Sequence, residues 1–179
     1  MKATMQSLKA RGADGFVFGI LNESEPGECD PSHGWIDVSR NKQLVQLADG
    51  LPCTFHRAFD LIPESEWNFA LSDIMDCGFT SILTSGGPSG TQATDCVHKL
   101  AILVDWNNKQ IARAGKILKK KVPEIIVGGG VRATNIAQLR RITAASVFHS
   151  AALRVSSETV CTSEVSSMKE QLHRSLACT

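Results

Sequence analysis

The sequence predicts an α/β fold built around a parallel β-sheet, and two observations support this prediction. Five short runs of apolar, β-branched and aromatic residues recur along the 179-residue chain, and segments with helical periodicity separate them. Runs that are apolar throughout are typical of strands buried on both faces, as in parallel sheets joined by right-handed crossovers. The predicted strands are Gly15–Leu21, Leu51–Phe59, Thr80–Gly86, Glu124–Gly130 and Ser146–Ala152.

Capping residues and side-chain spacing predict three helices in the first half of the chain. Ala3–Lys9 forms a helical stretch before the first strand. Val38–Ala48 follows Asp37, whose carboxylate suits the N-cap position. Pro63–Asp76 begins with proline and acidic residues and ends shortly before Gly78, a typical residue just beyond a helix C-terminus.

The connection between the third and fourth strands is long and predicts two further helices. They are Cys96–Val104 and Lys109–Lys121, and Asp105–Asn108 (sequence DWNN) is expected to form the turn between them. After the fourth strand, Thr134–Thr143 places its apolar residues on one face and predicts another helix.

Composition and charge exclude several classes of protein. With 42% hydrophobic and 21% charged residues the chain is not a disordered or fibrous protein, and a formal net charge of +1 argues against binding nucleic acid through bulk electrostatics. No apolar run approaches the ~20 residues that span a bilayer, and the first residues lack the apolar core of a signal peptide. The six cysteines follow no Cys-x-x-Cys spacing, so we expect reduced thiols in the cytoplasm, with the nucleus as an alternative location.

Glycines and polar residues gather at the C-terminal ends of the predicted strands. In a (β/α)8 barrel the active site is built at this face, whereas a dinucleotide-binding sheet requires a G-x-G-x-x-G turn that the first strand lacks. A full barrel usually requires at least about 200 residues. The sequence therefore predicts a partial barrel of about five βα units, with strand ends at Gly19, His56-Arg57, Thr84–Gly86, Gly128–Gly130 and His149-Ser150.

Five segments give a specific resemblance to a known family. They are GFVFG (15–19), TFHRAFD (54–60), LTSG (83–86), GGG (128–130) and FHSA (148–151). In this order and spacing the chain resembles the CutC copper homeostasis protein family, most specifically through TFHRAFD. The resemblance implies a TIM-type (β/α)8 barrel in which these segments are the fourth to eighth strands, in an N-terminally shortened member. We expect residues 1–152 to form this barrel portion and residues 153–179 to form a Ser/Thr-rich loop and a short C-terminal helix.

The segment TFHRAFD supplies candidate catalytic residues. Imidazole can act as an acid, a base or a metal ligand, and a guanidinium can hold a carboxylate or phosphate through two hydrogen bonds. An alternative is purely structural: Arg57 and Asp60 pair to hold the loop, while the histidine bonds backbone. The candidates are His56, Arg57 and Asp60.

Two glycine-containing strand ends are candidates for binding an anion. A glycine run before a helix exposes backbone N–H groups, which favour negative charge, and barrel loops after the last two strands often hold phosphate. The alternative is a tight turn that binds nothing. The candidate residues are Thr84, Ser85, Gly86, Gly128, Gly129 and Gly130.

Candidate copper ligands are few. Soft thiolates select Cu(I), and imidazoles also bind copper. Cys29 lies near other residues of ligand character in an extended loop, and His149 is expected to approach His56 across the barrel mouth. The alternative is that each histidine is structural and each thiol inert, Cys96 among them.

Three hypotheses about function remain open at this point. The resemblance implies a copper homeostasis protein whose cofactor and partner is the copper ion, as Cu(I). A second hypothesis is an inactive, truncated product. The third is an enzyme acting on a phosphorylated or carboxylated metabolite. Without three further strands, Gly15–Leu21 would be an unpaired edge, so we expect a homo-oligomer formed through the open side of the barrel.

Overall fold

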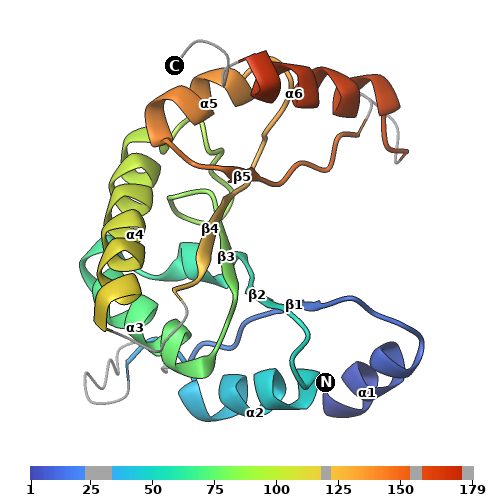
Figure 1. The fold of residues 1–179 in the computed structure, drawn as a ribbon, viewed down its shortest axis with the longest axis vertical. Coiled ribbons are helices and arrows are strands. Elements are labelled where there is room, and N and C mark those ends of the chain that lie inside the picture. Colours follow the sequence, from blue (N-terminus) through green and yellow to red (C-terminus); the bar gives the residue numbers. More distant parts are fainter. Residues whose placement is uncertain (23–33, 118–121, 154–158, 175–179) are drawn as a thin grey trace.

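The computed structural model describes residues 1–22, 34–117, 122–153 and 159–174, and it is built on one parallel sheet of five strands. The strands lie in chain order, without the reversal that a doubly wound sheet shows. This arrangement confirms the predicted α/β fold with part of a TIM-type barrel (Figure 1). The strands are β1 (Phe16–Phe18), β2 (Cys53–Phe55), β3 (Ser81–Thr84), β4 (Glu124–Val127) and β5 (Val147–Phe148).

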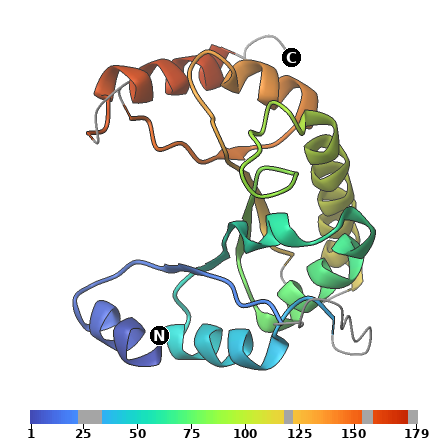
Figure 2. The ribbon, with the colours of Figure 1, turned by 180° about the vertical axis from the view of Figure 1, so that it is seen from behind.

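The helices give the molecule the outline of a crescent, with α1 and α6 at its two tips and the open side between them (Figures 1 and 2). None of the described helices combines the length and the apolar character that a membrane crossing requires. The helices are α1 (Lys2–Ala10), α2 (Val38–Ala48), α3 (Trp67–Cys77), α4 (Val97–Ile117), α5 (Ile136–Thr143) and α6 (Thr162–Arg174), with 3-10 turns η1 (Arg57–Leu61) and η2 (Glu64–Glu66).

The predicted capping residues act where the sequence places them. The Asp37 carboxylate accepts a hydrogen bond from the Arg40 N–H at the start of α2, and Gly78 ends α3 with a φ of 90°. One boundary differs from the prediction. Pro63 has an extended backbone (ψ 145°), so the residues that follow it form η2 and α3 begins only at Trp67.

The predicted break in the long connection is wrong. Asp105–Asn108 forms no turn, because α4 runs through it as one helix. Its buried stripe of Leu100, Leu103 and Val104 continues to Asn107, which is only 3% exposed. The segment contains no glycine or proline to end a helix, and Lys109 pairs with Asp105 one turn earlier at 2.6 Å.

The register divides the sheet into a covered face and an open face. Phe55 and Ile82 pair across β2 and β3 and are fully buried on the helix side. Val17 and Thr54 pair on the opposite face, where Val17 is 64% exposed. Among the described strands β1 pairs only with β2, so the outer edge of β1 is open; pairing of this edge with a second copy stays a prediction.

Candidate functional site

The carboxylate of Asp60 is the centre of a hydrogen-bond network at the C-terminal ends of β2 and β3. The turn η1 follows β2 directly and carries Asp60 to the end of β3, where its side chain is fully buried. Its Oδ1 accepts hydrogen bonds from Thr84 Oγ1 (2.5 Å) and the Ser85 N–H (3.1 Å). Its Oδ2 accepts from Arg57 Nε (2.7 Å) and Ser85 Oγ (3.0 Å). Four donors therefore satisfy a charge that burial would otherwise make very costly.

Arg57 extends the network toward the loop after β3. Its Nη2 donates to Ser85 Oγ at 2.9 Å and to the Thr91 carbonyl at 3.3 Å. The Arg57 side chain is 37% exposed, but Asp60 neutralises its charge. These contacts are those of the structural alternative, in which the Arg57–Asp60 pair holds the loop. A catalytic role for either residue stays a prediction.

His56 lies against the end of β1. Its Nδ1 accepts the N–H of Ala58 at 3.1 Å, and a Cβ atom on Gly19 would come within 3.0 Å of the same nitrogen. With Nδ1 used as an acceptor, a neutral His56 carries its proton on Nε2. In this arrangement the ring offers a hydrogen-bond donor at Nε2. A metal or a base function at Nε2 would require the other tautomer, in which the proton lies on Nδ1 and the hydrogen bond from Ala58 is broken.

The glycine turn after β4 packs directly on the Asp60 network. Gly129 has a φ of 96°, and a Cβ atom there would lie 2.9 Å from the Cβ of Ser85. The carbonyl of Gly129 also accepts the N–H of Ala93, in the loop after β3, at 2.8 Å. The fold therefore brings the two predicted anion-binding loops together, although more than forty residues separate them in the sequence.

Most backbone donors of these two loops are already used within the protein. The N–H of Ser85 bonds Asp60, and those of Gly86 and Gly128 bond the side chain and the carbonyl of Thr84. The N–H groups of Gly129 and Gly130 have no hydrogen-bond partner within the described part of the chain. Any anion at this edge would therefore meet the turn after β4 first.

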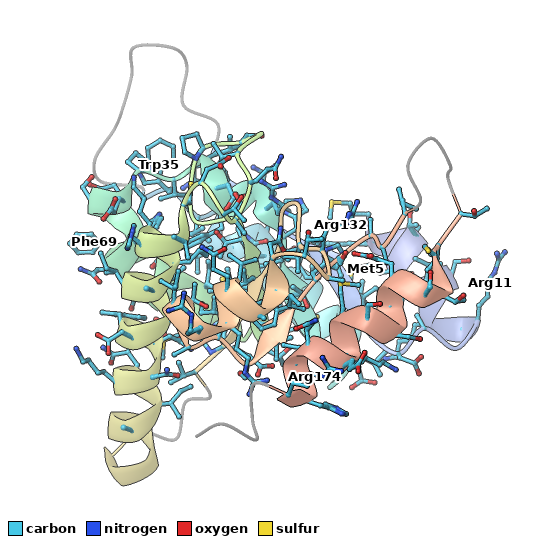
Figure 3. The ribbon with its side chains drawn as sticks, turned by 90° about the horizontal axis from the view of Figure 1, so that it is seen from above. Met5, Arg11, Trp35, Phe69, Arg132 and Arg174 are labelled. Atoms are coloured by element: carbon cyan, nitrogen blue, oxygen red, sulfur yellow. The ribbon has the colours of Figure 1, made fainter. Side chains whose placement is uncertain are left out.

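Sequence reasoning missed Arg132, whose side chain is labelled in Figure 3, as a candidate for this site. Its Nη1 donates to Ser150 Oγ at 3.0 Å and to the Val131 carbonyl at 3.2 Å. Across residues 1–22, 34–117, 122–153 and 159–174, no carboxylate pairs with its guanidinium. The signal was available: an arginine two residues beyond a glycine run at the C-terminal end of a barrel strand.

The structure separates the two histidines that were candidate copper ligands. His56 follows β2 and exposed His149 follows β5, with β3 and β4 between them, so three interstrand spacings of about 4.8 Å part their strands. No three His, Cys, Asp or Glu side chains of the described residues gather as a metal site. Cys29 lies outside the described residues, so its role as a ligand stays a prediction.

One thiol, that of Cys96, joins the network at the strand ends. Its Sγ lies 3.7 Å from Thr91 Oγ1, which is itself 3.5 Å from Ser85 Oγ. A Cβ atom on Gly87 would come within 2.3 Å of that sulfur, so the glycine makes room for it. No sequence signal indicated this position, because it depends on how the loop after β3 folds back.

Two other thiols are buried in the core. Burial raises the pKa of Cys53, and burial together with the nearby Asp73 carboxylate raises the pKa of Cys77 to about 11. Both sulfurs are therefore protonated at neutral pH, and a protonated thiol is a poor metal ligand.

Comparison with known proteins identifies the family. The sequence pattern of the CutC family matches residues 1–154. The chain belongs to the CutC family. This confirms the resemblance seen in TFHRAFD and the four shorter segments.

Individual CutC relatives match most of this chain but only part of their own length. A CutC family protein of Streptococcus pyogenes is 35% identical over 138 residues, which are 77% of this chain and 56% of the relative. A mouse protein named as a copper homeostasis protein CutC homologue is 33% identical, over 85% of this chain and 47% of the relative. The crystal structure of a CutC protein from Streptococcus agalactiae superposes with a TM-score of 0.66 at 28% identity, covering 83% of this chain and 60% of that one. The chain thus spans about half the length of the curated relatives it matches.

Proposed function

We propose that this chain acts in copper homeostasis by binding Cu(I). The observation that carries the proposal is its membership of the CutC family, several of whose members are named as copper homeostasis proteins. A cytoplasmic or nuclear location belongs to the same proposal. We extend the role given by these relatives' names to a chain that spans about half of their length.

The chemistry of the side chains narrows the choice of residues that could bind Cu(I). Cu(I) prefers thiolates, and the raised pKa values of Cys53 and Cys77 disfavour these two. Half-buried Cys96 lies at the strand ends, where barrel proteins bind their ligands. No group of three ligands is found among the described residues. We propose Cys96 as one ligand, with Cys29 and either His56 or His149 as its candidate partners, because the two histidines follow strands that are three positions apart in the sheet.

A thermal melt with and without Cu(I), under reducing conditions, tests the proposal. A ligand that binds only the folded state adds about 2.7 kcal/mol at a hundredfold excess over its Kd, which raises the Tm by several degrees. We expect this rise in the unmodified chain and its loss after alkylation of the thiols. Cys96→Ser should lower the rise, whereas Cys161→Ser, at another half-buried thiol, should keep it.

Other outcomes of the melt would separate the alternatives. A cooperative transition that ignores Cu(I) would contradict the copper proposal. A melt without any cooperative transition would support the hypothesis of an inactive product, because the five described strands would then not form a stable sheet by themselves.

A second candidate function is the binding of a phosphorylated or carboxylated metabolite. The specific observation in its favour is the turn after β4, where the guanidinium of Arg132 and the N–H groups of Gly129 and Gly130 lie close in the chain and have no acidic partner among the described residues. Arginine and backbone N–H groups are the usual donors to phosphate. In this proposal Arg132, and not the neutralised Arg57, supplies the positive charge.

Titration with inorganic phosphate, followed by NMR at the backbone amides, tests this second candidate. Arg132→Ala should weaken phosphate binding by about tenfold, the loss expected for one charge-assisted hydrogen bond. Arg57→Ala should change the affinity much less, because Asp60 already neutralises Arg57. Equal affinities in the unmodified chain and in Arg132→Ala would contradict the site.

A further inference from the structure

The C-terminal helix α6 places a carboxylate at the turn after β4. Glu164, in the first turn of α6, accepts the N–H of Ala133 through Oε1 at 2.8 Å. Ala133 directly follows Arg132 and lies three residues beyond Gly130. A negative oxygen of the protein is thus already bonded to the backbone N–H that directly follows Arg132 of the proposed anion site.

The contact is a tertiary one, and α6 lies beyond the segment that matches the CutC family. The match to the CutC family ends at residue 154, and α6 begins at Thr162. Arg140 Nη1 donates to the carbonyl of Leu172 at 2.9 Å, and buried Met168 joins the core. Figures 1 and 2 show α6 beside α5 at one tip of the crescent. Two separate contacts therefore hold the two ends of α6, one on α5 and one on the turn that precedes α5.

The helix dipole is a simpler explanation for an acidic residue at Glu164, but it does not explain the hydrogen bond to Ala133. An acidic residue in the first turn stabilises its own helix through the helix dipole. That effect requires only a negative charge near the start of α6, whereas Oε1 reaches across 31 positions in the chain to bond Ala133. The bond supplies to the turn before α5 the negative oxygen that a bound anion would supply.

We propose that Glu164 is a built-in competitor for anions at the turn after β4. Its carboxylate takes the place that one phosphate oxygen would occupy at Ala133, so phosphate binds fully only when α6 moves away or its charge is removed. This inference rests on the second candidate function, the anion site formed by Arg132, Gly129 and Gly130. It assigns to α6 the role of a covering segment for that site.

The test compares the affinity for inorganic phosphate in the full chain and in variants, by NMR at the amides of Gly129, Gly130 and Ala133. Glu164→Ala should bind phosphate about tenfold more tightly than the unmodified chain, since a charge-assisted hydrogen bond no longer competes. Glu164→Gln keeps an oxygen acceptor without the charge and should show a smaller gain. Glu170→Gln is the matched control on the same helix, because exposed Glu170 pairs with Arg174 and should leave the affinity unchanged.

The outcomes distinguish the proposed role of Glu164 from the second candidate function, the anion site, on which it rests. Equal affinity in the unmodified chain and in Glu164→Ala, together with weaker binding in Arg132→Ala, would overturn the role of Glu164 and leave the anion site intact. Absence of phosphate binding in every variant would overturn both. Retained helical signal in Glu164→Ala, with an unchanged Leu172 contact to Arg140, confirms that the variant keeps α6 in place.

Discussion

Replacement of Asp60 by asparagine should lower the free energy of unfolding by about 3 kcal/mol, the loss expected when one partner of a buried, hydrogen-bonded ion pair is removed. Each carboxylate oxygen of Asp60 accepts at least two hydrogen bonds, from Thr84 and Ser85 on one side and from Arg57 and Ser85 on the other. An amide must turn its NH2 group toward one of these pairs of donors. Each pair contains one N–H donor, from Ser85 or from Arg57, which cannot accept a hydrogen bond in return. At least one hydrogen bond is then lost, and Arg57 keeps an uncompensated charge. Urea unfolding followed by tryptophan fluorescence measures the loss.

The control for this prediction is an aspartate in an exposed pair. Asp105 binds Lys109 at 2.6 Å, but their side chains are 63% and 65% exposed, so Asp105→Asn should cost less than about 0.5 kcal/mol. If Asp60→Asn costs no more than Asp105→Asn, the network at the strand ends is not the element that holds η1 on β3. The TFHRAFD segment would then need another explanation for its Arg-x-x-Asp spacing.

Replacement of Gly129 by alanine should cost about 3 kcal/mol, the sum of a strained backbone and a steric clash. The φ of Gly129 is 96°, and its new Cβ would lie 2.9 Å from the Cβ of Ser85 and 3.4 Å from the Thr91 carbonyl. Either the turn after β4 or the loop after β3 must move. The NMR signals of the backbone amides in the turn after β4 and in the loop after β3 should shift, and the free energy of unfolding should fall in the same variant.

The chain supplies a matched control for the clash. Gly90 has nearly the same φ, 95°, but a Cβ atom there would meet nothing within 4 Å. Gly90→Ala should therefore show the backbone strain alone, about 1 kcal/mol. Equal costs for the two variants would show that the turn after β4 and the loop after β3 are not in close contact.

The sequence by itself determined the elements and the local pairs. Short apolar runs predicted the five strands, and Asp37 and Gly78 predicted the ends of two helices, because these signals act within one turn or one strand. The Arg57–Asp60 pair was also foreseen as an alternative, since three residues within η1 separate its members. The family followed from TFHRAFD, a segment long enough to be specific.

The tertiary structure decided which of these local features meet. Burial of Leu100, Leu103 and Val104 against the rest of the fold keeps α4 continuous where the sequence DWNN predicted a turn. The same packing leaves Oδ1 of Asn107 buried without a hydrogen-bond partner among the described residues. The positions of Cys96 and Arg132 at the strand ends, and the bond from Ala133 to Glu164, depend on loops and helices that pack from distant parts of the chain. Local propensity does not encode such contacts, because their free energy arises only when the separate elements are packed together.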